Sequence, residues 1–285
     1  MFSKLRQRFV NRWLVQPPSI WGKLPNQVDY VRHCCSAAEA QSWQRWASEV
    51  WLRRSTASRS QRSLKPKQQW VELKAPVAKP DMEFVPVTFV LLPGTLDFAP
   101  NHFVQGACVA SHDNVGRQCP LIIYQKISPY WMRRMLESQM QKKGRSKGDR
   151  CFVSVGHKPK PEADLLFWMT RVAARVHAAD LSVFALSALV DQVWQQFEPG
   201  WVQLLGGDVK TINPAALITL LERYSVADQL LDTANGLRGV SYLPWVNWPQ
   251  RLLREELPLS AFWQQDVDGG YVNASDNLFS LWRDS

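Results

Sequence analysis

Runs of consecutive apolar residues predict several short strands in this chain. Residues 85–92 pass from alternation into a continuous apolar run, which is typical of a strand buried on both faces. Similar runs predict strands over 104–110, 120–125 and 151–155, and residues 181–186 are also compatible with a strand. None of these runs approaches the roughly 20 apolar residues that a membrane-spanning helix needs.

Apolar positions at helical spacing predict helices before, between and after these strands. Asn213 is a favourable N-cap and Pro214 a favourable first helical residue, so one helix is expected to begin there. The predicted helices cover residues 36–54, 129–141, 162–179, 187–197, 213–223 and 225–235.

The first residues predict a basic amphipathic helix over 2–14. Its large apolar side chains, Phe2, Leu5, Phe9 and Trp13, repeat at helical spacing, and lysine and arginine occupy the rest of its surface. Such a segment either lies on an anionic membrane, packs its apolar stripe on the domain, or frays.

Strands that alternate with helices predict an α/β fold. We expect a three-layer α/β/α sandwich with a central mixed sheet and a helix-rich C-terminal half. The predicted organisation is a basic N-terminal segment at 1–16, ended by Pro17-Pro18, and a single domain at 17–285. A basic, poorly hydrophobic insertion is expected at about 55–80; its 55–63 part has the composition of either a kinase-accessible tail or a solvated linker.

Charge is distributed unevenly along the chain. The net charge is +9, but residues 1–160 hold 26 Lys/Arg against 10 Asp/Glu, whereas residues 161–285 hold 8 against 15. The basic half can face an acidic partner, pair with the acidic half, or lie in solvated loops. Because few aromatic residues are interleaved with the basic ones, the sequence supports no dedicated nucleic-acid function.

Cysteine usage favours a reducing compartment. The five cysteines are odd in number and form no Cys-x-x-Cys pair, and no secretory signal precedes them. The sequence therefore predicts a cytoplasmic protein with free thiols.

Sequence signatures of catalysis, cofactors and metals are missing. The chain lacks the Gly-x-Ser-x-Gly elbow, the phosphate-binding loop and the dinucleotide-binding glycine pattern, and no histidine pair has metal-binding spacing. His33 stands beside Cys34 and Cys35, but sequence neighbours rarely have the geometry of a nucleophile and its base. We therefore predict no catalytic, cofactor or metal site.

Two compact segments stand out as candidate functional residues: the first comprises residues 20–25 and 28–31, and the second comprises residues 111–121. In the second, Asp113 and Arg117 lie four residues apart across Gly116, where the backbone can adopt positive φ. An ion pair between them would hold the entry of the following strand. Alternatively, this loop forms a partner-docking surface together with Lys23 and Asp29 of the first segment.

Together the two segments resemble the signature of the TagF (ImpM) family of bacterial type VI secretion. In that family an aromatic-Gly-Lys-Leu-Pro segment is followed by Gly-Asp-Phe, and later by Asp-x-x-Gly-Arg-aromatic-Pro-Leu. Val28 stands here where the family has glycine, and Cys119 where it has an aromatic residue. The matching residues, and hence the possible partner-binding residues, are Trp21, Gly22, Lys23, Leu24, Pro25, Asp29, Tyr30, Asp113, Gly116, Arg117, Pro120 and Leu121.

The resemblance implies a non-enzymatic cytoplasmic regulator. Such a protein would repress assembly of the secretion system after translation by binding its forkhead-associated scaffold protein. It would be linked functionally to the threonine kinase and phosphatase pathway of that system. The resemblance also implies one compact unit with the three-layer architecture.

Two other interpretations stay open at this point. The first is a peripheral adaptor that binds anionic membrane or nucleic acid through the basic N-terminal half, with residues 1–16 touching the membrane. The second is an enzyme, which would need a cleft lined by Lys23, Asp29, Asp113 and Arg117 with strongly shifted pKa values.

Overall fold

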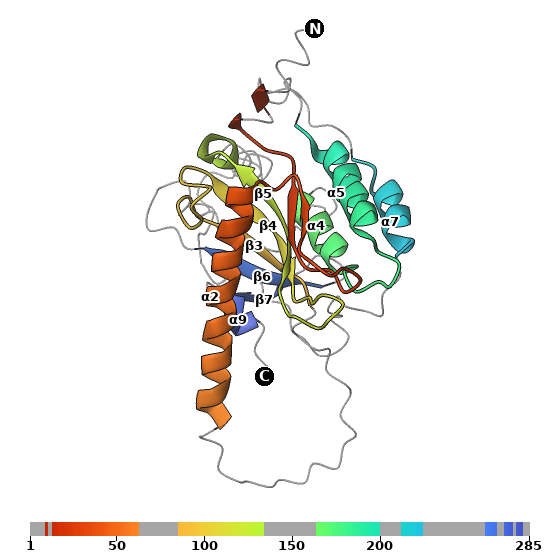
Figure 1. The fold of residues 1–285 in the computed structure, drawn as a ribbon. Coiled ribbons are helices and arrows are strands. Elements are labelled where there is room, and N and C mark those ends of the chain that lie inside the picture. Colours follow the sequence, from red (N-terminus) through yellow and green to blue (C-terminus); the bar gives the residue numbers. More distant parts are fainter. Residues whose placement is uncertain are drawn as a thin grey trace.

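The computed structural model describes residues 9–10, 13–62, 85–133, 164–199, 212–224, 260–266, 271–275 and 278–281. Within this part of the chain, strands from both halves of the sequence form one seven-stranded sheet (Figure 1). The strands lie in the order β2-β1-β5-β4-β3-β6-β7. In chain order they are β1 (Ser19–Gly22), β2 (Val31–His33), β3 (Val87–Leu91), β4 (Phe103–Val109), β5 (Leu121–Ile127), β6 (Ala261–Gln265) and β7 (Tyr271–Ser275).

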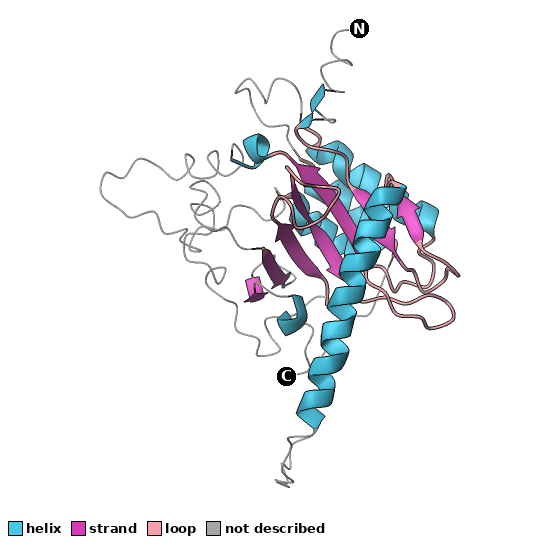
Figure 2. Cartoon of the chain, turned by 60° about the vertical axis from the view of Figure 1, so that its left-hand side comes forward, coloured by secondary structure: helices cyan, strands magenta, loops and turns pink. Residues whose placement is uncertain are grey.

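Helices lie on both sides of this sheet (Figures 1 and 2). On one side α4 contacts β4 and β5, α5 packs on α4, and α7 packs on α5. On the other side α2 crosses the sheet (Figure 2). The short α9 contacts β6 and β7 on that side, and it also contacts α2. The helices are α2 (Ala37–Arg62), α4 (Leu165–Ala173), α5 (Val183–Phe197), α7 (Pro214–Glu222) and α9 (Leu278–Leu281).

Burial on both faces explains the continuous apolar runs of the central strands. In β5, Leu121 and Ile123 belong to the apolar core beneath α4 and α5. Ile122 and Tyr124 of the same strand belong to the second core, beneath α2. Because successive side chains of a strand point to opposite faces, a strand with a core on each side has no polar face to alternate with.

Trp43 anchors α2 to the sheet. Its side chain is fully buried, and its ring contacts Tyr124 at 5.1 Å and Phe89 at 6.0 Å between centroids, both with tilted or edge-on geometry. Aromatic pairs of this kind stabilise a core beyond the area that they bury. At the start of the helix, Ser36 and Glu39 exchange backbone and side-chain hydrogen bonds of 2.7 and 3.3 Å in a capping box.

The structure confirms the α/β class and most of the predicted elements that it describes. Strands predicted at 85–92, 104–110 and 120–125 are β3, β4 and β5, and the helix predicted at 213–223 is α7. The Asn213 side chain caps α7 by accepting a 3.2 Å hydrogen bond from the Ala216 amide. The three-layer arrangement and the division into segments 1–16 and 17–285 stay predictions.

Two predictions about strands are wrong. Every strand pairing in the described part of the sheet is antiparallel, so this sheet is not mixed. Residues 183–186 are the first turn of α5 rather than part of a strand, because Ser182 caps that helix by accepting a hydrogen bond from Ala185. A short apolar run does not by itself distinguish a strand from a buried helix.

Helix lengths also differ from the predictions. α2 continues to Arg62, so the first residues of the predicted 55–80 insertion are helical; no glycine or proline interrupts them. α4 ends at Ala173 rather than at residue 179, and the chain enters turns directly after Ala173. Of the helix predicted at 129–141, residues 129–133 are described and helical. Residues 63–80 of the insertion, the 151–155 strand and the 225–235 helix lie outside the described residues.

Four strands were not predicted at all. β1 and β2 are too short to give a recognisable alternation, and β6 and β7 lie in a half of the chain whose pattern favours helices.

In the N-terminal segment Val10 is buried, whereas Phe9 and Trp13, expected on the apolar stripe, are each about half exposed. No helix in the part of the chain described here combines the length and apolar character needed to cross a membrane.

Gly22 provides a test of how closely β1 approaches β5. Its φ is +139°, and a Cβ atom there would lie 2.2 Å from the Pro120 carbonyl oxygen. We expect Gly22→Ala to lower the free energy of unfolding by about 3 kcal/mol or more, because it adds a backbone clash to an unfavourable φ. Urea unfolding measures this.

Gly116→Ala is the matched control. Gly116 also has positive φ (+83°), but nothing lies within 4 Å of its Cβ position. Its substitution should cost only about 1 kcal/mol, which is the conformational effect alone. Equal losses for the two variants would contradict a close approach at Gly22.

Candidate functional site

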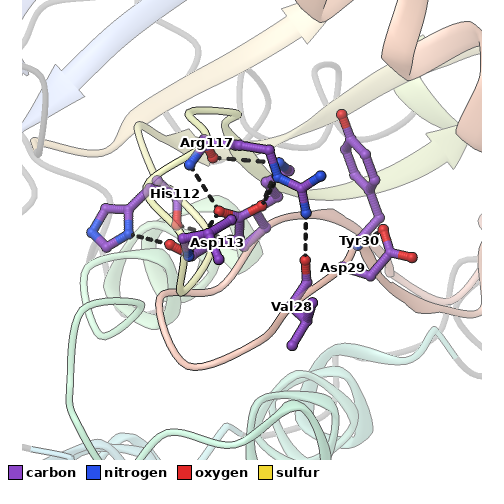
Figure 3. A network of polar contacts seen from close by, with 9 residues as sticks. Val28, Asp29, Tyr30, His112, Asp113 and Arg117 are labelled. Atoms are coloured by element: carbon purple, nitrogen blue, oxygen red, sulfur yellow. Dashed lines mark hydrogen bonds and ion pairs between the residues drawn. The ribbon is translucent and has the colours of Figure 1, made fainter.

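The two signature segments, far apart in sequence, lie against each other beside the β1–β5 pair. Five hydrogen bonds join them directly: Lys23 Nζ donates to Asp113 Oδ2 at 2.7 Å and to the Arg117 carbonyl at 3.4 Å, and three more reach backbone carbonyls of the first segment. The Asn114 amide donates to the Gln27 carbonyl at 2.9 Å, and the Ser111 hydroxyl donates to the Lys23 carbonyl at 2.8 Å. Arg117 Nη2 donates to the Val28 carbonyl at 2.7 Å (Figure 3). The loop after β1 and the turn before β5 are therefore one structural unit.

The Asp113 carboxylate is the centre of this unit. It is fully buried and accepts four hydrogen bonds. Oδ2 accepts from Lys23 Nζ at 2.7 Å and from Arg117 Nε at 2.6 Å, while Oδ1 accepts from the backbone amides of Arg117 (2.8 Å) and Val115 (3.2 Å). This number of donors satisfies the carboxylate completely, as a buried charge requires.

Electrostatics keep Asp113 ionised. Burial by itself would raise the pKa of its carboxyl, but the hydrogen bonds and charges of Lys23 and Arg117 outweigh burial and hold that pKa well below its usual range. Lys23 is itself only 4% exposed, and its ammonium also lies 5.1 Å from the centre of the Tyr30 ring. An isolated ammonium at this depth would be strongly unfavourable, so Lys23 depends on Asp113 as Asp113 depends on Lys23.

Aromatic packing supports the same unit from the side of α2. The Tyr30 ring stacks on Trp21 with 5.3 Å between centroids, and Cys119 is buried in the same core. Burial raises the pKa of the Tyr30 hydroxyl and of the Cys119 thiol to about 12 each. Neither group ionises near neutral pH, and both contribute packing rather than chemistry.

The two departures from the family pattern are compatible with this geometry. Val28 has no positive φ, so its backbone does not require glycine, and its side chain is 62% exposed. Cys119 occupies a buried position beside aromatic rings, where a thiol behaves as a small apolar group.

The remaining signature residues divide into buried and exposed groups. Leu24, Pro120 and Leu121 are buried, and Pro25 is half-buried. Asp29 is exposed and accepts a 2.7 Å hydrogen bond from the Tyr30 amide, so it does not enter the ion-pair cluster that Lys23, Asp113 and Arg117 form. The outer surface of the unit, which we call the signature face, consists of Val28, Asp29, Val115 and Arg117.

A further cluster joins His33 and Cys34, which are neighbours in sequence, to Asp191, which sequence reasoning missed. His33 of β2 lies 3.0 Å from Asp191 of α5, and the same nitrogen, Nε2, lies 3.6 Å from the Cys34 thiol. A cysteine–histidine–aspartate relay needs both ring nitrogens, one for each partner. Burial and the Asp191 carboxylate also raise the pKa of Cys34, which disfavours the thiolate. No local sequence pattern could link His33 to Asp191, because 158 positions separate them.

The arrangement as a whole is a structural ion-pair cluster that holds two loops together. Two cations pair with one carboxylate, and despite burial their hydrogen bonds to Asp113 keep its pKa well below the usual range. Within the described part of the chain, no cluster of three or more His, Cys, Asp or Glu side chains has the geometry to hold a metal ion.

Comparison with known protein families decides what these signature segments belong to. Residues 19–143 match the model for the TagF N-terminal domain, described as type VI secretion system-associated. The chain carries the N-terminal domain of the TagF family. The matched range includes both signature segments and the strands β1 to β5, so the predicted relationship to TagF is confirmed for this range.

Other comparisons add little to the TagF assignment. No curated protein matches the chain significantly. Among solved structures, the chain is similar to PA0076 from Pseudomonas aeruginosa PAO1, whose crystal structure was determined at 2.05 Å resolution. The two share 14% identity over 93% of this chain and 92% of that one, with a TM-score of 0.36.

The buried Lys23–Asp113 pair predicts a large effect of a single substitution. We expect Lys23→Met to lower the free energy of unfolding several times more than Arg45→Gln. Arg45 belongs to an exposed pair with Asp97, and such pairs contribute about 0–1 kcal/mol. Removing Lys23 instead leaves a buried carboxylate with one cation fewer. Urea unfolding of both variants measures the difference, and equal effects would contradict it.

Acid titration tests the protonation state of Asp113. A depressed pKa stabilises the fold fully above the unfolded value of about 3.9, and the stabilisation declines as the pH falls below it. The stability difference between the natural protein and Asp113→Asn should therefore be constant from about pH 7 to 5 and shrink below about pH 4. Urea unfolding at each pH measures it, and a difference that widens on acidification would contradict this assignment.

Proposed function

We propose that this chain is a non-enzymatic, cytoplasmic regulator of the type VI secretion system. In this proposal it represses assembly of the apparatus after translation by binding the forkhead-associated scaffold protein. The observation that carries the proposal is the match of residues 19–143 to the TagF N-terminal domain. The ion-pair cluster adds support, because the Asp113 carboxylate already accepts four hydrogen bonds and holds the two loops together.

The signature face is the docking surface in this proposal. Val28 and Val115 expose 62% and 65% of their surface, and the Arg117 side chain between them is 61% exposed. Arginine is enriched among interface anchors, and neighbouring apolar contacts such as these valines exclude water around it. Because Asp113 and the Val28 carbonyl already fix the Arg117 guanidinium, binding would immobilise little additional side chain.

The same proposal places the protein opposite the threonine kinase and phosphatase pathway of the secretion system. Occupying the scaffold would prevent the apparatus from assembling. We also propose that the whole chain is a three-layer sandwich, which the helices on both sides of the described sheet support.

A second candidate is a peripheral adaptor on anionic membrane. Phe9 and Trp13, half exposed in the basic N-terminal segment, are the observation that favours it. Flotation with anionic vesicles, with and without residues 1–16, distinguishes this candidate from the scaffold regulator.

Secretion assays test the regulatory proposal. Deleting the gene should raise effector secretion, and overexpression should lower it. Overexpressed Val28→Asp/Val115→Asp should fail to lower secretion and should bind the purified scaffold protein at least about tenfold more weakly, because it places carboxylates at apolar contact positions.

Ile218→Asp is the matched control, since Ile218 is a 44% exposed apolar residue on α7, away from the signature segments. It should repress and bind like the natural chain. Unchanged secretion after both deletion and overexpression would overturn the regulatory role. Normal scaffold binding by the double variant would overturn only the assignment of the docking surface.

A further inference from the structure

A second surface, separate from the signature face, lies at the edge of the sheet. β2 is the outermost strand, paired with β1 on one side only. Within the described part of the chain, no strand pairs with its other side. An edge strand presents backbone donors and acceptors that an added strand can satisfy.

A groove runs beside this edge. It has a volume of about 540 Å³ and is lined by His33 of β2 and by one side of α5: Val183, Phe184, Ser187, Ala188 and Asp191. Phe184 forms its rim and is 85% exposed, the most exposed of the large apolar side chains described. An aromatic side chain left this exposed beside a groove is typical of a binding surface.

The two faces of β2 differ in chemistry. Val31 and His33 point toward the α5 side, where Val31 joins the apolar core and His33 meets Asp191. Arg32 points to the opposite side, in register with Trp21 of β1. The Arg32 side chain is exposed and forms no ion pair or hydrogen bond with the side chains of the described residues. The edge therefore carries an exposed cation on one face and, on the other, a groove whose apolar lining is Val183, Phe184 and Ala188.

We propose that β2 binds an extended segment of a partner protein that alternates apolar and acidic residues. Backbone hydrogen bonds to β2 would make the segment an eighth strand of the described sheet. Because its side chains alternate between faces, all apolar ones would enter the groove under Phe184, and all carboxylates would lie on the side of Arg32.

Charge complementarity selects this occupant over a second copy of the chain. An antiparallel pair of β2 strands centred on Arg32 would place the two guanidinium groups directly opposite each other, which is unfavourable. A carboxylate at that position would instead pair with Arg32. Since the surface does not include the signature face, its test is independent of the scaffold protein.

Synthetic peptides test the proposal on the full-length protein. The probe is acetylated and amidated Val-Glu-Val-Glu-Val carrying a fluorescent label, with binding followed by fluorescence anisotropy. Val-Glu-Pro-Glu-Val is the first control, because it keeps the charge but has a proline that cannot donate to a strand ladder. Val-Lys-Val-Lys-Val is the second control, with the charge reversed. We expect the probe to bind and both controls to bind much more weakly.

Variants of the protein locate the site. Arg32→Glu should weaken binding of the acidic probe by about three- to tenfold and strengthen binding of the lysine peptide by a similar factor. Arg223→Glu changes the net charge equally at an exposed position at the end of α7 and should alter neither affinity. Ala188→Trp, which fills the groove, should weaken the acidic probe while Arg32 remains in place.

Each other outcome overturns the proposal. Equal binding of the proline peptide would show attraction to the basic protein without strand addition. Absence of binding by the probe would show that this edge is not available to a partner strand. A stable dimer in sedimentation experiments that Arg32→Glu/Phe184→Ala converts to monomer would identify a second copy as the occupant.

Discussion

The Asp113 carboxylate is the constraint on which the first half of the structure depends. It lies in the turn before β5, and its charge is balanced by Lys23 from the loop after β1 and by Arg117 from its own turn. The three charged groups hold the two loops together at the place where β1 and β5 pair. Because the two buried charges, Lys23 and Asp113, require each other, losing either one leaves an unpaired ion in the interior.

Local sequence patterns were sufficient for part of this architecture. The continuous apolar runs predicted β3, β4 and β5, because burial on both faces leaves a strong signal. Asn213-Pro214 predicted the start of α7, because helix caps depend on neighbouring residues. The Asp113–Arg117 pair was also accessible, because both residues belong to one turn. Lys23 could be associated with them only through the family resemblance, since 90 residues separate it from Asp113.

The elements that escaped prediction depend on long-range pairing. β1 and β2 are held by their neighbours rather than by their own propensity, and β6 and β7 join the sheet from the end of a helix-rich half. The same reason explains the His33–Asp191 contact and the groove beside β2, which exist only once α5 lies next to the sheet edge. In this protein the sequence predicts the central buried strands, whereas the surfaces available for recognition form only in the tertiary structure.

The position of β6 has a consequence for how the protein folds during synthesis. β3 is central in the finished sheet, yet its neighbour on one side, β6, begins only at Ala261. Until that residue leaves the ribosome, the apolar strand Val87–Leu91 has one unsatisfied backbone edge. Pairing across so many residues is slow, and an apolar edge exposed for that time is prone to non-native association. During synthesis β3 is therefore an edge strand for a long interval, although it is a central strand of the finished sheet.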